Sequence, residues 1–349
     1  MKGAYCLMPN KIKTTKLARW TLVGPGAVGL YYGGRIAHSG CKLCVLARSD
    51  AAELEAHGIR VKMIDPVSND LKETFTAQIE CVRGKAIKMA ATDCVIIAAK
   101  STYNLELIES LKSIVEPRHT VLLCLQNGLG NAEFFAEHFP ENTILAGLCF
   151  VCVNRTEPGV VENYHPGRVE IGSLGDRWSA AAKTVVEIFN QSGVVTSHAE
   201  KLDAALWRKL CWNIPFNGLS IAAGGIATDK ILAQPELVAR AHALMEEVRT
   251  AASLAGHSIS DKFIEGQFTV TKKMGAYRPS SLIDYLAKKP VELESIWGEP
   301  LRRGRALGAN MPELAKLYSD LKALLSTQGL HRYPYSKING DVNDPDIAP

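Results

Sequence analysis

A lysine and two asparagines recur every four residues between Trp207 and Asn217: Lys209, Asn213 and Asn217. On a helix these three side chains share one face, which apolar residues flank. Two amides could align a small oxyacid there, and the ammonium could offset the charge of a carboxylate or a developing alkoxide. A partly solvated helix face is the alternative interpretation. Pro215 interrupts the stripe and predicts a kink or freed backbone carbonyls.

A glycine-rich turn follows the apolar run 20–23 and consists of Gly24, Pro25, Gly26, Ala27, Val28 and Gly29. In a GxGxxG turn between a strand and a helix, the first glycine permits the bend and the second lets the backbone approach a diphosphate. The third glycine lets the helix pack on the strand. The helix N-terminus then attracts anions without any side-chain charge, so the turn predicts a dinucleotide site.

Arg48 ends the second expected strand, residues 42–47, where a site for NAD(H) usually has an acidic residue. A guanidinium pairs with phosphate oxygens, so Arg48 favours a 2′-phosphate and therefore NADP(H). Two alternatives stay open: Arg48 is a solvated surface residue, or Asp50 accepts hydrogen bonds from the ribose.

Polar residues also end two later expected strands, Lys100 after residues 94–99 and Asn127 after residues 120–125. In an open parallel sheet the ligand lies beyond the carboxyl ends of the strands, so both residues are candidates for a ligand site. A strand-end lysine reaching solvent and an Asn-Gly turn are the structural alternatives.

Size and composition fit an ordinary globular protein of two domains, with 349 residues, 47% hydrophobic and 22% charged. The net charge is +4, and basic residues without an acidic one cluster in residues 1–19. This charge does not imply a nucleic-acid partner, and the leader has no apolar core of a secretory signal. Without an apolar run of about 18 residues we expect no membrane span. We therefore expect a cytoplasmic protein, with a transit peptide to an organelle as the alternative.

The nine cysteines lie mostly in apolar, strand-like runs, which predicts buried thiols in a reducing compartment. Two CxxC spacings, Cys41 with Cys44 and Cys149 with Cys152, could in principle hold zinc. Both pairs fall in expected strands, where positions i and i+3 face opposite ways, so we predict no metal site.

Alternating strands and helices predict an α/β fold, with an N-terminal Rossmann-type doubly wound sheet followed by an all-helical C-terminal domain. We expect a hairpin over residues 160–171, one strand-like run ending near Val82, and one helix over residues 293–307. The predicted divisions are a basic leader at 1–19, a nucleotide-binding domain at 20–199, a helical substrate domain at 200–325 and a polar tail at 326–349.

Over roughly residues 20–325 the chain resembles the ketopantoate reductases (2-dehydropantoate 2-reductases). The resemblance depends on motifs in order: GPGAVG, Ala47-Arg48, Ala99-Lys100, Gln126-Asn127-Gly128, Trp207 to Leu210 with Asn213 and Asn217, and Pro279-Ser280 to Asp284 with Val291 to Glu294. It implies an enzyme of pantothenate biosynthesis that reduces 2-dehydropantoate to pantoate with NADPH, in a cleft between the two domains.

The resemblance also implies residue roles. Lys209 matches the catalytic lysine, which we expect to protonate the ketone oxygen, and Glu292 would hold that lysine or bind cofactor hydroxyls. Substrate contacts are implied for Asn213, Asn217 and Ser280, chosen over Ser281 by its spacing to Glu292. Asn127 would touch substrate and cofactor, while Arg48, Lys100 and Glu292 would lie near the cofactor.

The chain departs from the family at Ala227, where some members have a substrate-contacting asparagine, and at Gly218, where proline is frequent. The departures keep a second hypothesis open, an NADPH-dependent reductase of another 2-oxo acid or an imine. A third hypothesis is a regulatory protein that binds NADPH without turnover. The implied partner is a small 2-oxo acid, and a homodimer is the assembly that we consider.

Overall fold

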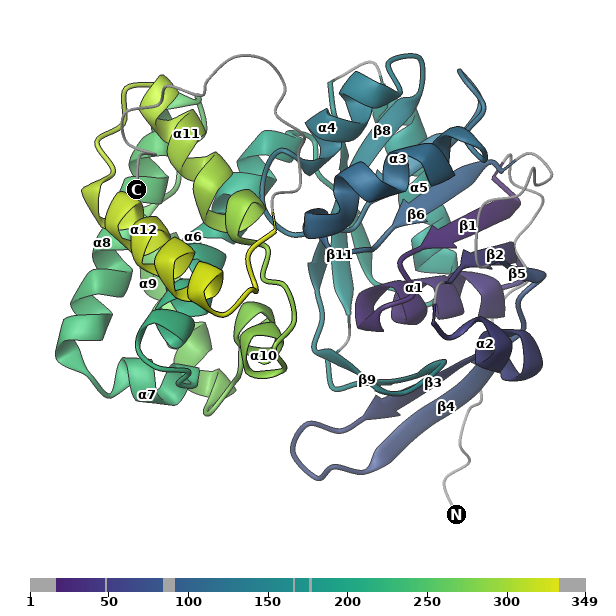
Figure 1. Cartoon of the computed structure of the whole chain (residues 1–349), viewed down its shortest axis with the longest axis horizontal. Helices are drawn as coiled ribbons and strands as arrows, with labels where there is room; N and C mark the ends of the chain where they lie inside the picture. The colour runs from purple at the N-terminus through teal and green to yellow at the C-terminus, as the bar shows by residue number, and fades with distance from the viewer. Residues whose placement is uncertain (1–16, 48, 84–91, 166, 176–177, 333–349) are drawn as a thin grey trace.

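The computed structural model describes residues 17–47, 49–83, 92–165, 167–175 and 178–332 of the chain. Strands with flanking helices lie on one side of the molecule, and a lobe of helices lies beside them (Figure 1). We call residues 17–199 the sheet region and residues 200–332 the helical region. This arrangement confirms the predicted α/β fold with a helical C-terminal part.

The main sheet of the sheet region has eight strands in the order β12-β11-β8-β7-β6-β1-β2-β5. All neighbours pair in parallel except β11, which runs antiparallel to β8. The central strands β6 and β7 are buried at every position, as in a sheet that is covered on both faces. The strands are β1 (Arg19–Val23), β2 (Lys42–Leu46), β5 (Cys81–Arg83), β6 (Cys94–Ile97), β7 (Val121–Cys124), β8 (Thr143–Phe150), β11 (Arg168–Ser173) and β12 (Thr196–His198).

Helices cover both faces of this sheet, which makes it doubly wound. On one face α1 (Ala27–His38) and α5 (Ser179–Gln191) share a core with the strands, for example through Trp20, Tyr32 and Phe189. The opposite face packs on α3 (Asn104–Lys112), which follows the short helix η1 (Ser101–Tyr103), and on α4 (Asn131–His138). The remaining helix, α2 (Ala51–His57), lies near the edge strand β5.

A second sheet of four strands, in the order β4-β3-β10-β9, covers the outer side of α1. Its strands are β3 (Ile59–Ile64), β4 (Leu71–Ala77), β9 (Val153–Glu157) and β10 (Val160–Asn163). Helix α1 therefore lies between two sheets, and this explains why every residue from Gly29 to Ala37 is buried. Arg35 is buried between the layers and forms an ion pair with Glu73 of β4 at 2.9 Å.

The second sheet overturns two sequence predictions. The expected hairpin over residues 160–171 is wrong, because β10 pairs with β9 and β3 whereas β11 joins the main sheet. The strand-like run expected to end near Val82 is divided between β4 and β5, which also belong to different sheets. Alternation shows that a segment is a strand, but it does not identify the partner strand.

One cysteine prediction is also wrong, because Cys44 is not a free thiol. The parallel register of β2 and β5 sets Cys44 opposite Cys81, with 4.7 Å between their Cα atoms, and the two form a disulfide. The other cysteines that the structure describes are free, and four of these six are buried. Within the described part of the chain, no three His, Cys, Asp or Glu residues gather as a metal site.

The helical region forms around its own core, which includes Trp207, Phe216, Leu244 and Trp297. Helix α6 (Leu202–Ala222) continues through Pro215 and packs on α8, α10 and α12. Where one helix over residues 293–307 was expected, a π-helical turn η3 precedes α11. The helices are α6, α7 (Thr228–Leu232), α8 (Pro235–Leu254), α9 (Asp261–Met274), α10 (Ser280–Leu286), η3 (Glu294–Gly298), α11 (Glu299–Ala306) and α12 (Pro312–Thr327).

No helix among the described residues combines the length and the apolar character that crossing a membrane requires. Of the predicted leader and tail, residues 1–16 and 333–349 lie outside the described residues.

Candidate active site

The predicted glycine turn, Gly24 to Gly29, connects β1 to α1. Gly24 has φ +86°, and a Cβ there would lie 2.2 Å from the backbone nitrogen of Ala99, so this position requires glycine. Gly26 is exposed, and a Cβ there would meet no atom within 4 Å. No side chain of the described residues caps the N-terminus of α1 at this glycine. The first-turn N–H groups of α1 therefore border open space, which fits the diphosphate of a dinucleotide.

The end of β2 carries the residues on which the predicted coenzyme preference depends. Arg48 lies outside the described residues. Asp50, the alternative ribose acceptor, is buried at 7% exposure, and its carboxylate accepts hydrogen bonds from Arg155 at 2.5 Å and from Ser49 at 2.9 Å. Both carboxylate oxygens of Asp50 are therefore engaged within the protein.

Lys209 reaches from α6 to the loop after β7, where its Nζ donates a hydrogen bond to Asn127 Oδ1 at 2.9 Å. The two residues are 82 positions apart, and each was a separate prediction from the sequence. This hydrogen bond crosses from the helical region to the sheet region. The structure thus brings Lys209 and Asn127 together at the carboxyl end of β7.

Burial lowers the pKa of Lys209 below its ordinary value, because desolvation disfavours the ammonium. Cys149 and Glu292 oppose this effect by favouring the charged form. The Phe150 ring also faces the ammonium, with its centroid 5.6 Å from Lys209 Nζ. Lys209 is therefore a cation whose proton is held less tightly than that of an exposed lysine.

Glu292 and Lys100 meet where the end of β6 touches the segment before η3. The backbone N–H of Ser101 donates to Glu292 Oε1 at 2.9 Å. Burial raises the pKa of Glu292, and nearby Asp284 adds to this, while Lys100 and the Ser101 N–H oppose it. Lys100 forms an ion pair with Asp284 and approaches the carbonyl of Pro290 at 3.4 Å. These contacts join strand β6 to the helical region.

The stripe predicted on α6 is confirmed as a helix face, and it leads from Lys209 into the interior. Asn213 is 8% exposed and Asn217 is 2% exposed. Asn217 Oδ1 accepts a hydrogen bond from the backbone N–H of Ser281 at 3.0 Å. Ser280, the first residue of α10, is exposed and lies next to this contact along the chain.

The loop after β7 is fitted closely to η3. Gly128 has φ +89°, and a Cβ there would lie 2.0 Å from the carbonyl oxygen of Ser295. The same oxygen accepts a hydrogen bond from the N–H of Leu129 at 2.8 Å, and the Ser295 hydroxyl lies 3.0 Å from that of Ser101. Glycine at 128 is thus required by both conformation and space.

Sequence reasoning missed several residues that contribute to this site. No sequence pattern marked these residues, because a serine, a phenylalanine or an arginine without a surrounding motif is ordinary in any chain. They are Ser101 and Ser295, which join the two regions, Phe150 at the lysine, and Arg155 at Asp50. Asp284, which pairs with Lys100, was part of a family motif, but no role was predicted for it.

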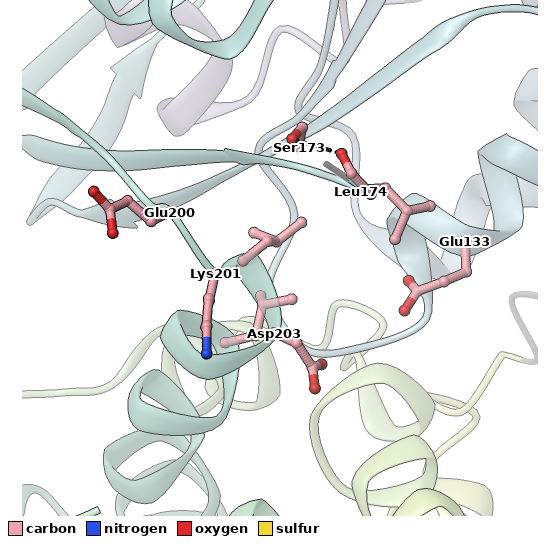
Figure 2. A pocket seen from close by; sticks show the side chains of 9 residues that line it. Glu133, Ser173, Leu174, Glu200, Lys201 and Asp203 are labelled. Atoms are coloured by element: carbon pink, nitrogen blue, oxygen red, sulfur yellow. Dashed lines mark hydrogen bonds between the residues drawn. The ribbon is translucent and has the colours of Figure 1, made fainter. Parts of the chain in front are cut away.

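A separate cavity of about 220 Å³ lies near the start of α6 (Figure 2). It contains none of the predicted site residues. Two of its carboxylates are paired, Glu133 with Arg303 at 2.7 Å and Asp203 with His257 at 2.9 Å. Its lining has three carboxylates, Glu133, Glu200 and Asp203, and one cation, Lys201, so the excess of negative charge does not suit an anionic substrate. The lining residues are Glu133, Ser173, Leu174, Gly175, Glu200, Lys201, Leu202, Asp203 and Leu206.

Comparisons with known proteins cover nearly all of both regions. Residues 20–176 match the family model described as ketopantoate reductase PanE/ApbA, and residues 201–325 match the model of its C-terminal part. A 2-dehydropantoate 2-reductase from Nostoc sp. is 33% identical over 88% of this chain and 95% of its own length.

Solved structures agree with these matches. The crystal structure of 2-dehydropantoate 2-reductase from Geobacter metallireducens is 32% identical, with a TM-score of 0.81 over 88% of this chain and 99% of that one. A ternary structure of D-mandelate dehydrogenase with NADH and anilino(oxo)acetate has a TM-score of 0.79 at 20% identity, over 89% of this chain and 99% of that one. At this low identity the second likeness shows the fold alone.

Proposed function

This chain belongs to the ketopantoate reductase family and is therefore an oxidoreductase, and from that premise we propose that it reduces 2-dehydropantoate to pantoate with NADPH. The observation that carries the proposal is the hydrogen bond from Lys209 to Asn127, at the carboxyl ends of the parallel strands. This contact brings a partly buried cation from the helical region to the carboxyl end of β7, where a nucleotide is expected to bind.

In the proposed reaction, Lys209 donates a proton to the ketone oxygen as the alkoxide forms. A general acid is most effective when its pKa is close to the working pH, and the lowered pKa of Lys209 brings it closer than an exposed lysine. The negative charge of Glu292 favours the charged ammonium and partly offsets the effect of burial. The bound nicotinamide would supply the hydride that reaches the ketone carbon.

The cofactor would be held by the turn Gly24 to Gly29 and by Lys100, Asn127 and Glu292. NADPH rather than NADH is supported by two observations. Arg48 follows β2, where a guanidinium suits a 2′-phosphate. Asp50, the acidic residue nearby, already has both carboxylate oxygens occupied by Arg155 and Ser49, so it is poorly available to ribose hydroxyls.

For the substrate, we assign Asn213, Asn217 and Ser280 to the carboxylate and hydroxyl groups. Asn213 and Asn217 continue the face of α6 that carries Lys209, and Ser280 directly precedes Ser281, whose backbone N–H donates to Asn217 Oδ1. We also retain the nucleotide-binding domain at 20–199 and the substrate domain at 200–325 as the functional division, with a cytoplasmic location and a homodimer as further predictions.

The test is NADPH oxidation by the purified chain with 2-dehydropantoate, compared with NADH at equal concentration. We expect turnover with NADPH and a clearly higher kcat/KM than with NADH. Equal use of NADH would contradict the role of Arg48, and no turnover with 2-dehydropantoate would contradict the proposed substrate.

Ala227 supports a second candidate, a reductase of another 2-oxo acid. This residue precedes α7 and has no side-chain amide for a substrate hydroxyl, although some family members have an asparagine at this position. A panel of 2-oxo acids and one cyclic imine, each with NADPH, separates the candidates. A higher kcat/KM for another member of the panel would replace 2-dehydropantoate as the substrate.

A further inference from the structure

Behind the Lys209–Asn127 contact lies a closed ring of amide hydrogen bonds. Gln126 Nε2 donates to Asn104 Oδ1 at 2.7 Å, and Asn104 Nδ2 donates to Asn131 Oδ1 at 3.1 Å. Asn131 Nδ2 then donates to the backbone carbonyl of Asn127 at 2.8 Å. Because Gln126 and Asn127 are consecutive, the peptide bond between them closes the ring.

Backbone carbonyls fix the orientation of every amide in this ring. Gln126 Nε2 also donates to the carbonyl of Ala99 at 2.7 Å, and a carbonyl can only accept. Asn131 Nδ2 likewise donates to the backbone carbonyl of Asn127, which can only accept. With both ends fixed, Asn104 must accept from Gln126 and donate to Asn131, so the three donors point the same way around the ring.

Two members of the ring are buried, and the ring joins separate elements. Asn104 is fully buried and Asn131 is 4% exposed, at the first residues of α3 and α4 respectively. Hydrogen bonds that run in one direction in such a setting strengthen one another, and an amide left without its partner is costly. The ring therefore holds the loop after β7 in one conformation relative to both helices.

The ring holds the backbone of Asn127, whose side chain contacts Lys209. Asn127 is followed by Gly128, which has a positive φ. Glycine has large backbone freedom, so the sequence of the loop itself gives the loop little rigidity. We propose, on the basis of the proposed function, that Asn104 and Asn131 are positioning residues, which fix the Asn127 backbone so that its side-chain oxygen meets the Lys209 ammonium. Within the described part of the chain, neither asparagine forms a hydrogen bond with Lys209 itself.

Asn104→Asp tests this proposal with a change of almost no volume. One carboxylate oxygen still accepts from Gln126, but the other faces Asn131 Oδ1 with no hydrogen to give. If Asn131 rotates to supply its NH2 group, its oxygen then faces the Asn127 carbonyl. We expect kcat to fall roughly tenfold or more, since small displacements of reacting groups are costly. The KM for NADPH should change much less, and wild-type kcat in the folded variant would overturn the proposal.

The pH profile distinguishes this role from a merely structural one. Once protonated, the carboxyl group that Asn104→Asp introduces has one O–H donor and one acceptor, so it restores the direction of the ring. Burial raises the pKa of such a carboxyl. The ratio of variant to wild-type kcat should therefore recover as the pH falls from about 8 toward about 5. A ratio that stays constant over this range would contradict the positioning role of the ring.

Asn142→Asp provides the matched control. Asn142 is also buried, at 3% exposure, and donates to the carbonyls of Glu116 and Thr120, at the amino ends of β7 and β8. It should lower the melting temperature as Asn104→Asp does, yet leave kcat within about twofold of wild type. An equal loss of kcat in both variants would indicate general destabilisation and overturn the proposal.

A measurement without cofactor separates this proposal from the proposed function. The lysine side chains are labelled with ¹³C at Cε and titrated by NMR, and the Lys209 signal is identified by its absence in Lys209→Arg. Loss of a fixed acceptor should lower the pKa of Lys209 in Asn104→Ala relative to wild type. An unchanged titration overturns the positioning role. Inactive wild-type protein would instead contradict the proposed function, while the titration still decides the role of the ring.

Discussion

Two glutamates, Glu292 and Glu294, lie two residues apart in the helical region and experience opposite environments. Burial raises the pKa of Glu292. Burial acts in the same direction on Glu294, but hydrogen bonds from His331 and Tyr318 and the charge of Arg302 outweigh it and lower the pKa. The cost of burying a carboxylate charge is thus poorly compensated at Glu292 and well compensated at Glu294.

The contacts explain the difference. Glu294 has a side chain that is 1% exposed, and it accepts from Arg302 at 2.9 Å and from Tyr318 at 2.9 Å. Among the residues that the structure describes, only Ser101 donates to the Glu292 carboxylate, which lies at the junction with the sheet region. A carboxylate with spare acceptor capacity at a junction is suited to a ligand or a catalytic partner. A saturated one is suited to holding helices together.

The largest expected effect is on Glu292. Glu292→Gln removes both the negative charge that favours the Lys209 ammonium and the carboxylate that we propose contacts the cofactor, and kcat should fall about tenfold to a hundredfold, or about 1.4 to 2.7 kcal/mol. The free energy of unfolding should change by less than about 1 kcal/mol, because no ion pair with Glu292 is broken among the described residues. Steady-state kinetics and urea denaturation measure the two quantities. A large loss of stability with normal kcat would contradict the functional role of Glu292 and assign it the structural role proposed for Glu294.

Glu294→Gln should show the converse pattern. It removes the carboxylate that pairs with Arg302 and His331, and the free energy of unfolding should fall by about 2 kcal/mol, less than for a fully buried pair because Arg302 is half exposed and keeps its ion pair with Glu299. The kcat of the folded enzyme should stay within about twofold of wild type. Glu109→Gln, at an exposed ion pair, is the control and should be nearly neutral.

Acidification should weaken the protein through Glu294. Its folded pKa lies below the unfolded value, so its stabilisation is present above about pH 4.5 and is lost as the pH falls through the lower folded value. Thermal unfolding at pH 6 and pH 4 in wild type and Glu294→Gln measures this. The variant should lose less stability on acidification. An equal loss in both proteins would assign acid sensitivity to other carboxylates.

The smallest expected effect is a shift in the pH profile of the reaction. Activity should decline on the alkaline side as Lys209 loses its proton, at a pH below the ordinary lysine value of 10.5. Because the Glu292 carboxylate raises the pKa of Lys209, Glu292→Gln should move this decline to lower pH by less than about one unit. The dependence of kcat/KM on pH measures this shift. A shift to higher pH would contradict a negative charge on Glu292 beside the Lys209 ammonium.

The same segment illustrates what the sequence could predict. Glu292 was predicted as a functional residue from its resemblance to a family motif, whereas Glu294 was only part of that motif. Nothing local distinguishes the two. The pairing of Glu294 with Tyr318 and His331 depends on contacts over 24 and 37 residues, which only the packing of α12 and the following segment establishes.

Elsewhere the predictions succeeded where a pattern is local. The glycine turn, the buried strands β6 and β7 and the α6 stripe all follow from spacing within about ten residues, and all were predicted close to their observed bounds. Strand partners were less predictable. The second sheet and the Cys44–Cys81 disulfide were missed because they depend on which strands become neighbours.

By itself, the sequence determined the alternation of strands and helices in the sheet region, the glycine turn and the face that Lys209 shares with Asn213 and Asn217, because backbone geometry fixes periodicity locally. Tertiary structure alone decided that Lys209 meets Asn127, that an amide ring supports the loop, and that two neighbouring glutamates differ. Burial and charge compensation arise between segments far apart in the chain, so a single stretch of sequence cannot specify them.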